Sequence, residues 1–188
     1  MRKIGVMVTS GLLLSLALVA LAATTGWVLS PVADAIPFDW TPLTGTSHVA
    51  MVNNVNECDK NATYNWTRKV RAMDMYHLDF SGIPNGATIN QIQIDPCASG
   101  QRTGISYVST MDVGYRAFEE GQLVSEAFGG NYQFDYWSGT TPAWLTTSTF
   151  NVSIVKGQNT QITIGPKLTG GDKGEKISAI TAKIFFSL

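Results

Sequence analysis

Few side chains in this sequence have the type and spacing that catalysis needs. The two histidines, His48 and His77, lie far apart, each in a stretch whose alternating apolar residues predict a strand. Histidine is the usual acid–base group near neutral pH, but an isolated one within a strand is more often structural. The HExxH, GxSxG, GxGxxG and Walker motifs do not occur. We therefore expect no enzymatic activity and no cofactor.

The acidic residues do not predict a metal site. Glu119 and Glu120 are adjacent, and neighbours on a strand face opposite ways, so they fit a hairpin end before Gly121 better than a carboxylate pair. Asp172 and Glu175 lie in a glycine-rich turn and could help to hold Ca²⁺. Calcium takes about 6–8 oxygen ligands, so two carboxylates are weak evidence for such a site.

Cys58 and Cys97 are the only cysteines. In an exported protein, an isolated pair is most simply one disulfide. Closing a loop of about 40 residues would stabilise the fold by roughly 4 kcal/mol in the chain-entropy model. The competing interpretation is two free thiols or metal ligands, but no CxxC or His–Cys spacing accompanies the pair.

The N-terminus has the pattern of an export signal. Arg2 and Lys3 precede a stretch without charge up to Asp34, and residues 11–23 are almost continuously apolar. Small residues offer two cleavage points, at residues 20–22 and at residues 33–35, and the second leaves a mature chain that begins at Ile36. We assign residues 1–35 to a signal peptide or hydrophobic segment and residues 36–188 to the folded domain. A secreted, cell-surface location follows.

Two other interpretations keep this segment in the mature protein. Residues 4–29 are long enough to cross a bilayer as a helix, which would act as a membrane anchor or as the core helix of a pilus. The segment resembles the start of a type IV prepilin, although Ile4 separates the basic pair from Gly5 and no Glu follows in the first turn. Alternatively, an extended tail could add a strand to a neighbouring subunit through its apolar residues, which are Trp27, Val28, Leu29 and Val32.

Composition excludes two classes of protein. Charged residues make up 14% of the chain and the formal net charge is −1, so the basic surface of a nucleic-acid binder is missing. Hydrophobic residues make up 44%, which is too many for a disordered chain. A length of 188 residues suits one domain with a buried core.

Beyond residue 40, apolar and polar residues alternate with period two, which predicts strands. Turn signals rich in Gly, Asn and Pro separate about eight or nine of them. That number fits an antiparallel two-sheet sandwich or jelly roll, with a hydrophobic N-terminal helix before it. The clearest strands lie at residues 47–52, 71–80, 91–95, 111–117, 132–136, 150–154, 162–164 and 180–186.

Three N-x-[ST] sequons predict glycosylation, at Asn61, Asn65 and Asn151, in a host that has the machinery. Asn151 alternates with Phe150 and Val152, so its side chain should point outward. A cluster of aromatic residues predicts either core packing or a sugar-binding platform. Its members at residues 132, 134 and 136 share one strand face and fit the core. Trp137 and Trp144 are the candidates for a ligand or subunit interface.

Several of these segments resemble a β-sandwich surface domain of secreted and phage structural proteins. They are residues 74–76, 83–94, Trp144, residues 150–152 and residues 180–186, with Asn151 where that domain has Gly. The similarity covers about residues 38–187. It implies a structural, adhesive or display module and supplies no active site.

Together these features predict an exported cell-surface structural protein, a subunit of an extracellular pilus-like filament or surface layer that associates into a homopolymer. The alternative is a secreted carbohydrate-binding or adhesion module whose partner is a polysaccharide. A small secreted hydrolase is the third hypothesis, because an active site can be assembled from residues distant in sequence. Contact with a membrane is expected only through an uncleaved N-terminal segment.

Overall fold

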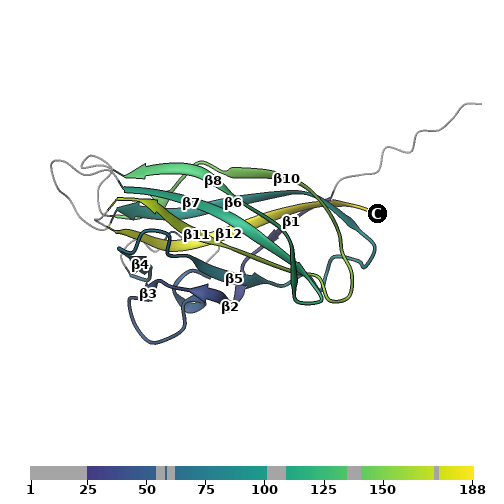
Figure 1. Ribbon diagram of the computed structural model, residues 1–188, viewed down its shortest axis with the longest axis horizontal. Helices are drawn as coiled ribbons and strands as arrows, with labels where there is room; N and C mark the ends of the chain where they lie inside the picture. The colour runs from purple at the N-terminus through teal and green to yellow at the C-terminus, as the bar shows by residue number, and fades with distance from the viewer. Residues whose placement is uncertain (1–24, 54–57, 59–61, 101–108, 135–140, 172–173) are drawn as a thin grey trace, which may run out of the picture.

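The computed structural model describes residues 25–53, 58, 62–100, 109–134, 141–171 and 174–188, and these fold as an elongated β-sandwich (Figure 1). Twelve strands in this part of the chain form two antiparallel sheets, so the predicted fold class is confirmed. The only helical element among the described residues is a turn of 3-10 helix, η1 (Val49–Met51). The predicted N-terminal helix lies outside them. Within the described chain, no helix has the length and apolar character that crossing a membrane requires.

The first sheet has seven strands. Five follow one another across it: β10 (Ser148–Val155), β6 (Thr88–Gly100), β12 (Glu175–Ser187), β4 (Asn65–Thr67) and β3 (Thr41–Pro42). Two more attach beside this path: β1 (Thr25–Leu29) on β12, and β9 (Ala143–Trp144) on β6.

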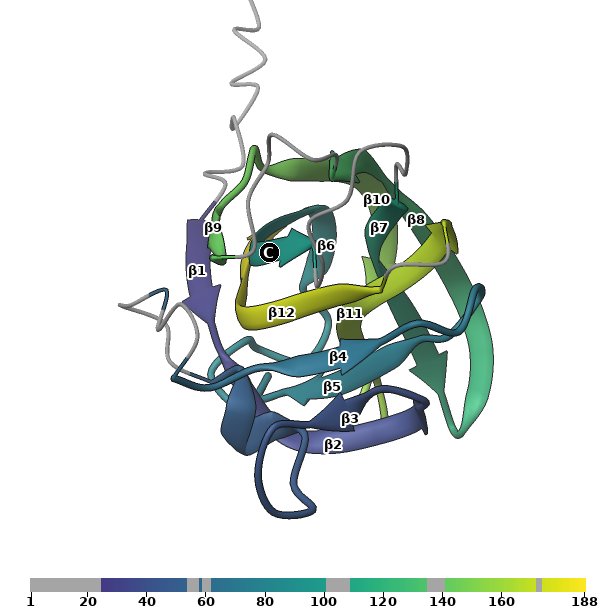
Figure 2. The ribbon, with the colours of Figure 1, turned by 90° about the vertical axis from the view of Figure 1, so that its left-hand side faces the viewer.

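The second sheet has five strands. Its order is β2 (Pro31–Phe38), β5 (Asp74–Leu78), β11 (Gln161–Gly170), β7 (Ser109–Glu119) and β8 (Gln122–Phe134). Figure 2 shows β2 and β5 side by side at one edge of the sandwich and β8 at the other.

The core lies between the sheets and is built by the period-two pattern that the sequence shows. Ile92 and Ile94 of β6 face inward, as do Ile162 and Ile164 of β11, and all are buried. Tyr132 joins the same core cluster, which confirms the core interpretation for its strand. The two sheets therefore pack together through aliphatic and aromatic side chains that point inward from alternate positions of the strands.

The hairpin predicted at Gly121 is present between β7 and β8. Glu119 pairs with Gln122, and the two residues between them, Glu120 and Gly121, have φ of 50° and 79°. Positive φ at both central positions defines the two-residue turn whose twist matches that of the strands. Glu119 is thus a strand end and not half of a carboxylate pair.

Two features differ from the expectation. Twelve strands exceed the predicted eight or nine, because two- and three-residue strands such as β3, β4 and β9 are too short to show alternation. The stretch 47–52 forms η1 instead of a strand. β2 runs across the expected boundary at residue 35, so described strands lie on both sides of it, and the division of the chain there stays a prediction.

Cys58 and Cys97 form the predicted disulfide, with their Cα atoms 5.7 Å apart. Cys97 lies in β6 and is fully buried, whereas Cys58 precedes β4. The bond therefore ties a connecting segment to the middle of the first sheet.

Candidate functional site

The first candidate site is the segment that the sequence assigns to a leader or tail. We call residues 25–38 the N-terminal arm; it consists of β1 and β2, with only Ser30 between them. β1 pairs antiparallel with β12, placing Val28 opposite Lys183. β2 pairs antiparallel with β5 of the other sheet. The N-terminal arm therefore crosses from the first sheet to the second (Figure 2).

β1 presents an apolar face to the core. Trp27 is paired with Ile184, whose side chain is buried, so the indole lies on the core side of the sheet. It meets the ring of Phe186 edge-on, with 6.5 Å between the ring centroids. On its other side the indole rests on Gly82, where a Cβ atom would overlap the ring. Trp27 is nevertheless 39% exposed, so β1 covers the rim of the core rather than its centre.

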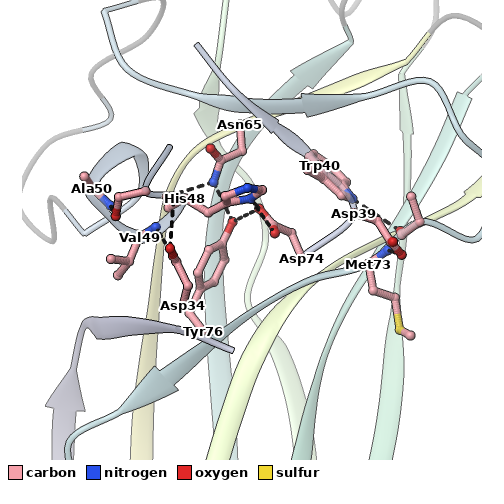
Figure 3. A network of polar contacts seen from close by, with 12 residues as sticks. Asp34, Asp39, Trp40, His48, Val49, Ala50, Asn65, Met73, Asp74 and Tyr76 are labelled. Atoms are coloured by element: carbon pink, nitrogen blue, oxygen red, sulfur yellow. Dashed lines mark hydrogen bonds and ion pairs between the residues drawn. The ribbon is translucent and has the colours of Figure 1, made fainter. Parts of the chain in front are cut away.

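Besides its pairing with β5, β2 is tied to η1 through the carboxylate of Asp34. The Asp34 oxygens accept the backbone N–H groups of His48, at 3.2 Å, and Val49, at 2.5 Å, as Figure 3 shows. These N–H groups begin η1, where helical geometry leaves donors without partners. Asp34 thus fastens β2 to η1. Asp34, all of β1 and most of β2 precede Ile36, so a chain that begins at Ile36 would lack these contacts; where the mature chain begins stays a prediction.

A buried polar network continues from this anchor. His48 Nδ1 lies 2.8 Å from Asp74 Oδ1, and the Tyr76 hydroxyl donates to Asp74 Oδ2 at 2.6 Å. Asn65 Nδ2 donates to the Tyr76 hydroxyl and to the His48 carbonyl, each at 2.9 Å (Figure 3). Every member is largely or fully buried, which makes the network a structural link between β4, β5 and η1.

Burial is the main influence on the pKa values of Asp74 and Tyr76 in this network. It raises the pKa of Asp74 to about 6, and the hydrogen bonds from Tyr76 and His48 oppose the rise only in part. Burial, with the Asp74 charge second, also raises the pKa of Tyr76 well above its usual value. The other histidine, His77, is half-buried in β5, and burial lowers its pKa.

Trp144 lies at the second candidate site. It is 41% exposed on β9, opposite Cys97 of β6. Beside it is a hollow of about 240 Å³ lined by Trp144, Leu145, Asp95 and Thr181. The Asp95 carboxylate accepts a hydrogen bond from the Thr147 hydroxyl. Trp137, the other predicted ligand aromatic, lies outside the described residues.

A second hollow, of about 270 Å³, opens on the outer face of the second sheet, where the sequence predicts no site. Its lining includes Ile36, His77, Phe118, Gln161 and Thr163. These residues come from four strands that are distant in sequence, so no local pattern could have revealed it.

The three sequons differ in accessibility. Asn151 is exposed on β10, so its side chain points outward as expected. Asn65 is fully buried, and its amide nitrogen donates two hydrogen bonds inside the fold. Both amide hydrogens of Asn65 are thus engaged inside the fold, and use of the sequons stays a prediction. Asn61 lies outside the described residues.

Glu175 is an isolated buried carboxyl at the start of β12. It is fully buried, and its oxygens lack a hydrogen bond of ordinary geometry in the part of the chain that the structure describes. Burial raises its pKa to about 8, and the neighbouring Ser109 hydroxyl opposes this only in part. Asp172 lies outside the described residues, and within them no three His, Cys, Asp or Glu side chains gather as metal ligands would.

The chain matches no family model and no curated protein sequence. Among solved structures it is similar to the CBM36-1 domain of a multidomain xylanase from the hindgut metagenome of Trinervitermes trinervoides. That similarity has 12% identity and a TM-score of 0.36, over 85% of this chain and 96% of that domain. It is also similar to dimeric latent PorU from Porphyromonas gingivalis, with 8% identity and a TM-score of 0.39, over 88% of this chain and 13% of PorU. We rest no functional argument on similarity this distant.

Proposed function

We propose that this protein is an exported, non-enzymatic, cell-surface structural protein that assembles into a homopolymer by exchange of β1 between copies. The observation that carries the proposal is the position of β1. It covers residues 182–186 of β12 as a separate strand, joined to the rest of the fold through Ser30 alone.

The contacts of β1 suit exchange. If β1 left, the backbone groups of β12 between Ala182 and Phe186 would form an open sheet edge, and open edges attract strands. The β1 of a neighbouring copy would restore the same hydrogen bonds and return its Trp27 to Gly82 and Phe186. Because an exchanged element makes identical contacts, closed and exchanged forms differ little in free energy, which makes exchange a low-cost route to assembly.

The remainder of the N-terminal arm would stay in place. Asp34 fastens β2 to η1 of its own chain, and Asp34 and Val32 lie beyond Ser30. Val32 is therefore assigned to the fixed part, while Trp27, Val28 and Leu29 belong to the exchanging strand. The N-terminal arm also carries five large hydrophobic residues that are exposed in the single chain: Trp27, Val28, Val32, Ile36 and Phe38. Exchange alone repeats the contacts of the single chain, so any burial of these residues would come from new contacts between neighbouring copies.

A covalent lock tests the proposal. Cysteines introduced together as Val28→Cys and Lys183→Cys face each other across β1 and β12, and oxidation of the dilute monomer would hold β1 in its own chain. We expect the parent and each single-cysteine variant to form fibres in negative-stain micrographs and to pellet, and the locked variant to remain monomeric. Fibres from the locked variant at the parent's yield would show that assembly does not use β1.

The hollow at Trp144 supports a second candidate function, carbohydrate binding. An exposed ring beside a carboxylate and hydroxyl groups combines stacking with a few directed hydrogen bonds, which is how small-ligand sites achieve orientation. Retention of the protein by insoluble polysaccharide, and its loss in Trp144→Ala, is the direct test. A parent protein that no polysaccharide retains would contradict this second candidate.

A further inference from the structure

A line of polar side chains runs along the outer face of β6 toward Trp144. Gln91, Gln93 and Asp95 alternate with the buried residues Ile92 and Ile94, so the three polar side chains point away from the core. Their places are fixed by the same alternation that builds the core.

The amides in this line are joined by hydrogen bonds. Gln91 Nε2 donates to Asn151 Oδ1 at 3.1 Å, and Gln93 Nε2 donates to Gln91 Oε1 at 3.0 Å. A primary amide has two donors and two acceptor positions, so each amide in the chain can bind a further polar group. The bonds hold the amides in place before any ligand arrives.

The line leads to the hollow at Trp144. Asp95, which lines the hollow, follows Gln93 by two residues, and Trp144 is paired with Cys97 two residues further on. At about 3.3 Å per residue, the distance from Gln91 to the level of Cys97 is roughly 20 Å. We call the line formed by Asn151, Gln91, Gln93, Asp95 and Trp144 the β6 strip.

The chemistry of the β6 strip selects one class of ligand. Its groups are three amides, one carboxylate and one indole, and the neighbouring Lys183 ammonium sits over the Phe185 ring, 4.9 Å from the centroid. One negative and one positive charge cancel, so the surface offers no attraction to a polyanion such as nucleic acid. Amides that both donate and accept complement hydroxyl groups, which do the same, and the indole complements the face of a sugar ring.

We propose that the β6 strip binds an extended, neutral polysaccharide chain. One sugar stacks on Trp144 in the hollow, where the Asp95 carboxylate accepts hydrogen bonds and the Thr181 hydroxyl accepts or donates them, and the following sugars lie over Gln93, Gln91 and Asn151. This inference rests on the second candidate function and adds to it the direction, the length and the charge of the ligand.

The experiment measures the dependence of affinity on chain length. The full protein is made in a host without N-glycosylation, so that Asn151 carries no glycan. It is titrated calorimetrically with three series of ligands, built from glucose, xylose or mannose. Each series consists of the single sugar, the β-1,4-linked disaccharide and the β-1,4-linked hexasaccharide. For at least one of the three series we expect the hexasaccharide to bind about tenfold more tightly than the disaccharide. In the double variant Gln91→Ala/Gln93→Ala the hexasaccharide should bind only as tightly as the disaccharide, whose own affinity should be unchanged.

Two further variants separate the possible failures. Trp144→Ala should abolish binding at every length, and Gln161→Ala on the opposite sheet should leave all affinities at the parent value. If length has no effect, or the double glutamine variant binds hexasaccharides like the parent, the β6 strip is wrong while a sugar site at Trp144 stands. If the folded protein binds none of the saccharides, the β6 strip and the carbohydrate-binding function are both wrong.

Discussion

The indole of Trp27 occupies the space that a Cβ atom on Gly82 would need. Gly82 lies in the turn between β5 and β6 and directly precedes Ile83, a buried core residue. The two residues are far apart in sequence and meet only because β1 pairs with β12. Gly82 therefore controls how tightly β1 docks without itself belonging to β1.

Gly82→Ala should weaken the docking of β1. A methyl group there must displace the Trp27 ring, and overpacking of this kind costs about 1–3 kcal/mol. We expect faster amide hydrogen exchange in residues 25–29 than in the parent, with β11 unchanged. Gly129→Ala is the matched control, because a Cβ there meets only Phe150 at an ordinary 3.7 Å. Equal exchange rates in the parent and Gly82→Ala would contradict this account of β1.

Asp34→Ala should destabilise the fold by about 1–2 kcal/mol, since the N–H groups of His48 and Val49 lose their acceptor. Urea unfolding followed by tryptophan fluorescence measures this change. Asp39→Ala is the control: its carboxylate accepts one exposed hydrogen bond from Met73 N at 3.3 Å, so its loss should cost less. Equal losses in the two variants would show that Asp34 is not an anchor.

The stability of the protein should fall as pH rises, in part because of Glu175. In the unfolded chain this carboxyl ionises near pH 4.5, and in the fold its pKa is about 8. Between these values the folded state binds more protons, so the free energy of unfolding decreases with pH, by up to about 1.4 kcal/mol per unit. Glu175→Gln should remove this slope and gain a few kcal/mol at pH 9.

Two comparisons make the pH experiment specific. Asp74, whose pKa is raised to about 6, adds a slope of the same sign, but it is present in parent and variant alike and cancels in their difference. Glu120→Gln changes an exposed turn residue and should leave the profile unaltered. A parallel profile for Glu175→Gln and the parent would contradict the buried, protonated state of Glu175.

Opening the disulfide should cost about 4 kcal/mol, the chain-entropy value for a loop closed across a sequence separation of 39 residues. Cys58→Ala opens the bond without altering the buried side of the pair, and thermal unfolding by circular dichroism reports the loss. Cys58→Ala/Cys97→Ala should be less stable still, because Cys97 is fully buried and its truncation leaves space in the sheet. A Cys58→Ala protein as stable as the parent would show that the bond contributes little.

The sandwich itself could be predicted from the sequence, because strands such as β6 and β11 contain segments in which Ile alternates with polar residues, at residues 91–95 and 161–164. The N-terminal arm could not. Its apolar, weakly charged composition is that of a leader, and Ala33 and Ala35 match the small residues of a cleavage site. In the fold Ala35 also has a structural place: it is buried in β2 opposite Met75.

Some features of the candidate sites could also be predicted from the sequence, and others could not. The outward direction of Asn151 follows from local pattern, since it lies on a strand with a clear phase, whereas Trp144 lies on the two-residue strand β9, which shows no alternation. The burial of Asn65 does not follow from local pattern, because it depends on Tyr76 and His48, which only the folded chain brings to its amide. The hydrogen-bonded amides of the β6 strip could not be predicted from the sequence either. Gln91 and Asn151 are distant in sequence and meet only because β6 pairs with β10.

The exchange of β1 is tested most directly by cross-linking two different chains. One copy carries Val28→Cys and the other Lys183→Cys; the residues are paired in the structure, and neither variant can close this bond within its own chain. After the two proteins are mixed, allowed to assemble and oxidised, we predict a disulfide-linked dimer that contains one of each. If no mixed dimer forms, although the double variant in a single chain oxidises readily to an internal disulfide, β1 stays in its own subunit and the assembly proposed here is contradicted.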